Sequence, residues 1–347
     1  MTAASGRSDM QAAEQTRRLS WLDVMKLLCI LAVYCDHSNA GDHYQALFAY
    51  INGAFFFCSG YTASRRAGSF GQFARDKFTA IFWPYTTFAV LTLAVRACLT
   101  QVNAADYALR FLYGSRDYCC SITFWFLPCL FVMSLYYYGI SRAIRSPGGV
   151  LALCFAVSCA VKVLHEAPTL PWGMDMAARY LVYYALGDFL AHHGAALPKR
   201  ARYAALGAGC TWAMLTLRDA GGLPQRLWGQ PLPLAGLYVQ QFVTTLSLIC
   251  LLYTTARVLQ NVALLAKLGR STVIFCCCEE IAEIVPPFLW QSAGFAPLQP
   301  AGWAAVLYRL FTAVLVCVCI VIPVNRFFPW MVKYPGKAKN AMRSVKS

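Results

Sequence analysis

Residues 19–38, LSWLDVMKLLCILAVYCDHS, form an apolar run of transmembrane length that nevertheless carries Asp23, Lys26, Asp36 and His37. About 20 apolar residues suffice to cross a bilayer as a helix. An ionisable side chain within such a run is costly unless it faces protein or water. Four of them in one span therefore indicate a function beyond anchoring.

Asp23, Lys26 and His37 share one side of this predicted helix. Asp23 and Lys26 are three residues apart, and His37 follows Lys26 by three turns plus about 20°. Lys26 and His37 then lie about 16 Å apart along the axis, roughly half the hydrocarbon thickness. This pattern favours a polar path inside the protein. The alternative is a span whose lower charges lie among the lipid headgroups while His37 only ends the helix.

The rest of the chain is equally apolar. Its 347 residues are 59% hydrophobic and 13% charged, and the mean hydropathy is +0.50. Soluble domains of this size do not sustain such values, so we predict an all-α, polytopic integral membrane protein. The net charge of +15 is spread over short loops and not over an aromatic-interleaved patch, which argues against a nucleic-acid partner.

Charged or Gly/Pro-rich breaks separate the apolar runs and predict about ten transmembrane helices. These runs cover residues 19–38, 44–63, 78–99, 122–141, 149–165, 176–193, 203–217, 235–255, 271–290 and 301–323. Most Lys and Arg fall in alternate loops, which by the positive-inside rule places both termini in the cytoplasm. We therefore predict a polar cytoplasmic segment 1–18, a transmembrane domain 19–325 and a basic cytoplasmic tail 326–347.

The cysteines do not suggest a metal site. Most of the 16 lie inside apolar runs, where they are small buried hydrophobes. No CxxC pair has His or Cys partners at zinc spacing, so we expect no bound metal.

Four basic residues, Arg65, Arg66, Arg75 and Lys77, follow the second predicted span on its cytoplasmic side. Paired guanidinium groups suit phosphate binding, so the group is a candidate phosphate clamp. Ordinary positive-inside anchoring explains the same residues equally well.

The ninth span, 271–290, carries Glu279, Glu280 and Glu283 near the middle of the bilayer. Three buried carboxylates cannot all remain charged without partners. The available partners are Lys26, Arg179, Arg309 and His37. We expect one carboxylate to form a structural ion pair and a second to orient the histidine.

Six stretches, taken in order, resemble the membrane-bound acyltransferase 3 family, and within it the branch related to fucose 4-O-acetylase. They are WLDVMK with His37 after it, AFFFCSGY, KFTAIFWPY, FWFLPCLF, YYALGDFLA and LGRSTVIFCCCEEI. The resemblance implies ten or more membrane helices, acetyl-CoA as donor, and O-acetylation of a sugar hydroxyl on a cell-envelope glycan or its lipid-linked precursor. It also implies a location in a bacterial cytoplasmic membrane.

The same resemblance assigns roles to individual residues. The histidine matching His37 is the family's proposed catalytic residue, and the basic residue matching Lys26 is usually Arg. In much of the family the ninth-span motif ends with a histidine, where this chain has Cys278, Glu279 and Glu280.

We expect His37 to act as a general base that takes the proton of the acceptor hydroxyl. Asp36 can orient it only if the helix ends there, and a ninth-span carboxylate is an equal candidate, of which we take Glu280. Lys26, paired with Asp23, is expected to neutralise the CoA pyrophosphate or steady the thioester carbonyl. The remaining cations are expected to hold the CoA phosphates: Arg65, Arg66, Arg75 and Lys77. Direct transfer and an acetyl-histidine intermediate both remain open.

Two other function classes compete with the transferase. An ion-coupled transporter or flippase also uses intramembrane Lys, Arg and Glu. An inactive relative that serves as a scaffold or sensor would account for the missing ninth-span histidine. The acceptor and the oligomeric state are open at this point.

Overall fold

The computed structural model of the chain is helical almost throughout. It describes residues 19–38, 50–63, 69–163, 169–194, 198–218, 226–227, 230–231, 234–297 and 300–334. Within these ranges the only strands are the antiparallel pair β1 (Arg226–Leu227) and β2 (Gln230–Pro231). Apart from this short ribbon, the expected all-α class is confirmed.

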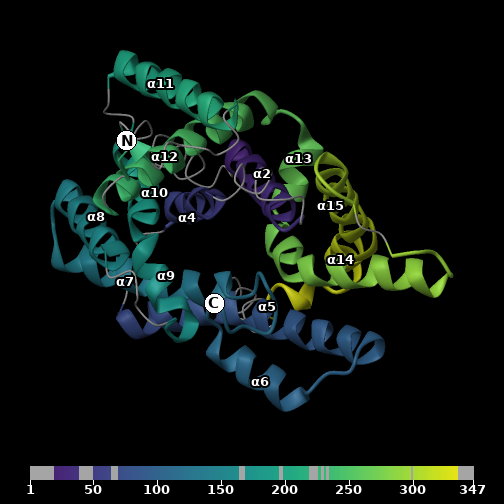
Figure 1. Ribbon diagram of the computed structural model, residues 1–347. Coiled ribbons are helices and arrows are strands. Elements are labelled where there is room, and N and C mark those ends of the chain that lie inside the picture. The colour runs from purple at the N-terminus through teal and green to yellow at the C-terminus, as the bar shows by residue number, and fades with distance from the viewer. Residues whose placement is uncertain are drawn as a thin grey trace, which may run out of the picture.

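Every predicted apolar run contains a helix (Figure 1). In chain order the helices are α2 (Ser20–Asp36), α4 (Ile51–Tyr61), α5 (Phe70–Leu99), α6 (Ala104–Tyr113), α7 (Phe126–Ala143), α8 (Pro147–Val163), η1 (Pro171–Gly173), α9 (Met174–Arg179), α10 (Leu181–His193), α11 (Lys199–Arg218), α12 (Leu234–Leu259), α13 (Ala263–Gly269), α14 (Thr272–Ser292), α15 (Trp303–Val316), the π-helical η3 (Cys317–Val321), α16 (Ile322–Phe327) and η4 (Pro329–Met331). The amphipathic α6 and the short α13 lie between the predicted runs.

Three helical stretches in the described ranges are long and apolar enough to cross a membrane. They are Phe70–Leu99, Tyr238–Leu259 and Trp303–Phe327, and Pro147–Val163 is apolar but shorter. The count of ten crossings and the cytoplasmic position of both termini stay predictions. The terminal segments 1–18 and 335–347 lie outside the described residues.

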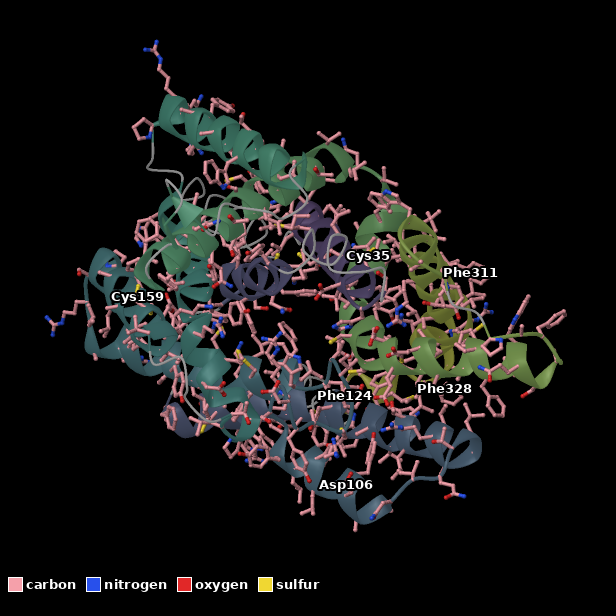
Figure 2. All side chains as sticks on the ribbon, in the orientation of Figure 1. Cys35, Asp106, Phe124, Cys159, Phe311 and Phe328 are labelled. Atoms are coloured by element: carbon pink, nitrogen blue, oxygen red, sulfur yellow. The ribbon has the colours of Figure 1, made fainter. Side chains whose placement is uncertain are left out.

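Helix α15 separates an outer apolar face from an inner polar one. Leu307 and Phe311 are 64% and 56% exposed, and Figure 2 shows Phe311 on the outer side of this helix. Arg309 and Thr312 lie on the opposite face and are 4% and 0% exposed. An apolar exterior with charged groups turned inward is the arrangement that a lipid environment favours.

Helix α2 packs against α4, α12, α13, α14 and α15, so its side chains meet the rest of the bundle on several sides (Figure 1). Glycines permit two of the closest helix approaches. A Cβ on Gly269, at the end of α13, would overlap the backbone carbonyl of Asp23, and one on Gly60 in α4 would overlap that of Tyr184 in α10. Small residues at such crossings allow backbones to approach closely inside a membrane.

Hydrogen bonds to the α14 backbone gather three segments around one point. The Tyr34 hydroxyl of α2 donates to the carbonyl oxygen of Phe275 at 3.0 Å. The Thr123 hydroxyl, just before α7, donates to the carbonyl oxygen of Cys276 at 2.6 Å. The carboxyl end of α2, the segment before α7 and the first half of α14 are thereby held together, and the candidate site lies where they meet.

Candidate active site

His37 is the residue at which α2 ends, and its backbone N–H still donates to Val33 at 3.1 Å. Its half-buried side chain lines a cavity of about 350 Å³. Val33 and Ile30, about one and two turns earlier on α2, line the same cavity. The side of α2 that carries His37 therefore faces an internal space over the last two turns of the helix.

Other elements close this cavity around the imidazole. The remaining lining residues come from α2 itself, α4, the segment before α7, the start of α7 and α14: Asp36, Asn52, Phe55, Arg116, Asp117, Ile122, Thr123, Trp125, Phe126 and Cys276. The lining thus combines apolar and aromatic surface with a few charged and amide groups, as is usual where a small substrate binds.

Glu279 of α14 is the carboxylate that faces the imidazole. Its Oε1 lies 3.4 Å from Nδ1 of His37, and its side chain is completely buried. The separation exceeds an ordinary hydrogen bond, but catalytic contacts are often long before substrate binds. A carboxylate opposite Nδ1 favours the tautomer with its proton on that nitrogen, which leaves Nε2 free to accept another.

Arg309 of α15 holds this pair in place. Its Nη2 donates to Oε1 of Glu279 at 2.8 Å, and its Nε donates to the backbone carbonyl of His37 at 2.9 Å. The same Nη2 lies 3.6 Å from a carboxylate oxygen of Glu283. One guanidinium therefore joins the end of α2, α14 and α15, which confirms the expected ion pair between the ninth-span carboxylates and a buried cation.

Glu280 faces a different partner. Its carboxylate lies 3.3 Å from Nη1 of Arg96 in α5, and the residue is 7% exposed. Successive residues on a helix point about 100° apart, so Glu279 and Glu280 cannot face the same group. We expected Glu280 to orient His37, and this is wrong: the carboxylate that faces the imidazole belongs to Glu279.

Asp23, the expected partner of Lys26, contacts a cation that the prediction did not assign to it. A carboxylate oxygen of Asp23 lies 3.5 Å from Nε of Arg270, just past α13, and Asp23 is only 3% exposed. Lys26 is half-buried on α2 and is not among the described residues that line the His37 cavity. Its expected role toward the thioester or pyrophosphate stays a prediction.

Of the four expected phosphate ligands, the structure describes two. Arg65 and Arg66 lie outside the described residues, and Arg75 is exposed near the start of α5. Lys77 lines a second cavity of about 370 Å³, together with Arg142 at the end of α7 and Arg145 just beyond it. The structure therefore brings Lys77 together with two cations that the sequence had assigned only to a loop.

The Lys77 cavity and the His37 centre lie toward opposite ends of the bundle. Lys77 and Arg96 are both on α5, and their separation in sequence corresponds to roughly 28 Å along the axis. Arg96 contacts Glu280, and the adjacent Glu279 faces His37. The end of α5 that carries Arg96 is therefore the end near His37. A hydrocarbon core is about 30 Å thick, so a ligand joining these two regions would be a long one.

The sequence did not single out Arg96, which it counted only among outer charges. A signal was available, because Arg96 falls inside the third predicted span and an intramembrane Arg calls for a partner. Within the described part of the chain, no three His, Cys, Asp or Glu side chains are arranged to hold a metal ion.

Comparison with known families gives one match. The model of the acyltransferase 3 family, described as an acyltransferase domain, matches residues 19–329, a range that includes His37, Glu279 and Arg309. No curated protein and no solved structure matches the chain. Since the family match covers nearly all of the described helices, the chain is an integral membrane acyltransferase and belongs to the acyltransferase 3 family.

Proposed function

We propose that this protein transfers an acetyl group from cytosolic acetyl-CoA to a hydroxyl of a cell-envelope glycan or its lipid-linked precursor. The observation that carries the proposal is the His37 imidazole, which lines a cavity while a buried carboxylate faces its other nitrogen. An imidazole so oriented suits proton abstraction from a hydroxyl near neutral pH.

In the proposed reaction, Nε2 of His37 takes the proton of the acceptor hydroxyl while its oxygen attacks the thioester carbonyl. The tetrahedral intermediate collapses, the carbon–sulfur bond breaks, and the imidazolium returns the proton to the departing thiolate. The products are the O-acetyl ester and CoA. Glu279 stabilises the transient imidazolium, and Arg309 holds that carboxylate in place.

The cationic cavity supports acetyl-CoA as the donor. Lys77, Arg142 and Arg145 line one space, and converging cations are what the phosphates of CoA require. In CoA the thiol lies far from the phosphates, so phosphate binding there is compatible with a thioester carried toward His37. Lys26 lies between the two ends on α2, where we propose that it steadies the thioester. Arg65, Arg66 and Arg75 complete the proposed phosphate site.

The orientation of the chain follows from the same assignment. A cytosolic donor requires the Lys77 end to face the cytoplasm, in agreement with the predicted loop charges, and leaves the acceptor to approach from the outer side. A bacterial cytoplasmic membrane and the fucose 4-O-acetylase branch remain parts of the proposal that only the resemblance supports.

Purified full-length protein incubated with radiolabelled acetyl-CoA and fractionated envelope glycans tests the proposal. We expect labelled glycan and released CoA with the wild type, loss of both with His37→Ala, and retention of both with Cys278→Ala. Cys278 is a suitable control because it is fully buried on α14 and lines none of the cavities described above. If the wild type neither labels any glycan fraction nor releases CoA, the transferase is refuted and a carrier is favoured.

A further inference from the structure

A third cavity, of about 560 Å³, lies beside the His37 cavity. It is bounded by the carboxyl end of α5, by α6, by the segment before α7 and by α14; Asp106, labelled in Figure 2, marks its α6 side. Ile122 lines both this cavity and that of His37, so the two spaces adjoin. The volume falls within the range of roughly 300–1,000 Å³ that small-molecule sites occupy.

The inner wall of this cavity carries buried polar atoms that protein groups leave unsatisfied. One carboxylate oxygen of Glu280 faces Arg96, but the other has no hydrogen-bond partner among the described residues. The hydroxyl of Ser121, which is 4% exposed, lies beside this carboxylate without a hydrogen bond of ordinary geometry. The buried Nε of Arg96 likewise has no acceptor within the described ranges.

Unsatisfied buried polar groups are costly, and native proteins rarely retain them without a ligand or water. Here a carboxylate acceptor, a hydroxyl and a guanidinium N–H lie on one wall. A ligand hydroxyl donates one hydrogen bond and accepts two, so adjacent hydroxyls on one ligand can satisfy all three groups.

The outer rim is already paired and is therefore preorganised. Arg110 donates from Nε to Asp106 at 2.7 Å, and the Tyr118 hydroxyl donates to the other oxygen of that carboxylate at 3.2 Å. Asn103 accepts from two backbone N–H groups at the start of α6. These bonds fix the shape of the rim before any ligand arrives.

The charges of the lining select against an anion. Three carboxylates, of Asp106, Glu280 and Glu283, face two guanidinium groups, of Arg96 and Arg110. The negative groups outnumber the positive ones, and both guanidinium groups already face carboxylates. A phosphate or uronate in this space would meet net repulsion, whereas an uncharged polyol would not.

A line of contacts connects this cavity to the proposed base. Glu283 lines the cavity and contacts Arg309, which in turn binds Glu279 and the backbone of His37. We propose that the cavity holds the acceptor as an uncharged, polyhydroxylated sugar unit, with Glu280, Arg96 and Ser121 as its specificity-determining residues. This inference rests on the proposed acetyl transfer.

Cys119 offers a test that does not depend on activity, because it is a free cysteine that lines the cavity. Full-length protein in detergent is labelled with a maleimide in the presence of methyl glycosides of neutral hexoses and 6-deoxyhexoses, or of glucuronate and glucose 6-phosphate. We expect neutral glycosides to slow labelling of Cys119 but not of Cys98, which is exposed on α5 outside the cavity. Protection by the anions alone, or by no sugar, would overturn the inference.

Kinetics with the best glycan fraction provide the second test. Glu280→Gln and Ser121→Ala should each raise the acceptor KM roughly ten- to hundredfold, as expected for lost hydrogen bonds to a charged or buried group. The KM for acetyl-CoA should change less than the acceptor KM. Asp175→Asn, which alters a carboxylate that lines none of the cavities, should change neither. An unchanged acceptor KM in active Glu280→Gln protein would refute this inference alone, whereas an inactive wild type would refute the proposed function.

Discussion

Nη2 of Arg309 donates to Oε1 of Glu279 at 2.8 Å, and both side chains are almost completely shielded from solvent. Two charges so far inside a bundle are tolerable only together, because each removes the need to solvate the other. The pair also carries the contacts that position His37, so the stability of this region and the proposed catalysis depend on the same atoms.

Removing Arg309 should destabilise the protein strongly. Arg309→Met leaves the Glu279 carboxylate buried without its partner, for which we expect a loss of about 3–5 kcal/mol in the free energy of unfolding. Thermal unfolding in detergent measures the effect. The double variant Arg309→Met with Glu279→Leu should recover much of the loss while remaining inactive. A single variant as stable as the wild type would show that the pair contributes little.

Glu279→Gln should slow the chemical step without weakening donor binding. The amide cannot stabilise the imidazolium that forms during transfer, so kcat should fall roughly a hundredfold while the KM for acetyl-CoA stays near the wild-type value. Steady-state CoA release separates the two parameters. A rise in KM with unchanged kcat would mean that Glu279 acts in binding and not in orienting the base.

Neutralising the cations of the second cavity should weaken donor binding. Lys77→Gln and Arg142→Gln should each raise the KM for acetyl-CoA about three- to tenfold, since each removes a charged donor from the proposed phosphate site. Lys199→Gln is the matched control, because this exposed lysine lies on α11 away from that cavity. Equal effects from all three variants would point to a general loss of surface charge and not to a phosphate site.

Close helix contact at Gly269 should make this residue hard to replace. Gly269→Ala forces a Cβ against the Asp23 carbonyl, and we expect a loss of about 1–3 kcal/mol as α13 moves away from α2. Gly139→Ala in α7 meets no atom within 4 Å and should instead be neutral or stabilise by roughly 0.5–1 kcal/mol. Thermal unfolding of the two variants gives the comparison, and equal stability would contradict the packing argument.

Labelling at the two ends of α5 tests the orientation. A cysteine introduced by Gly71→Cys, where the structure is open, should react only from the cytoplasmic side, and native Cys98 near the other end only from outside. A membrane-impermeant maleimide applied to intact cells and to inverted vesicles distinguishes the sides. External labelling of the new cysteine would overturn the predicted topology and the cytosolic donor together.

The helices could be predicted well from the sequence because apolar length alone identifies them, and each predicted run does contain a helix. The gaps between the runs were harder. Helix α6 is short and amphipathic, and α13 spans only seven residues, so neither carries the hydropathy signal of a span. Because α13 was not predicted, the contact between Asp23 and Arg270, which directly follows that helix, was not predicted either.

The site was predictable in its chemistry but not in its pairing. Carboxylates at 279, 280 and 283 inside a predicted span called for cations, and one of the expected partners, Arg309, does bind Glu279. Which carboxylate faces His37 depends on the rotation of α14 about its axis, and neighbouring residues differ there by about 100°. That rotation is set by contacts such as the Tyr34 hydrogen bond to Phe275, which link residues far apart in the sequence.

The hydrogen bond from Arg309 to the carbonyl of His37 joins residues that are 272 positions apart in the sequence. During synthesis α2 emerges from the ribosome well before α15, the helix that carries Arg309. Until the segment that carries Arg309 leaves the ribosome, His37 lacks this contact, so the proposed acetyl transfer can begin only after nearly all of the family-matched segment has been made.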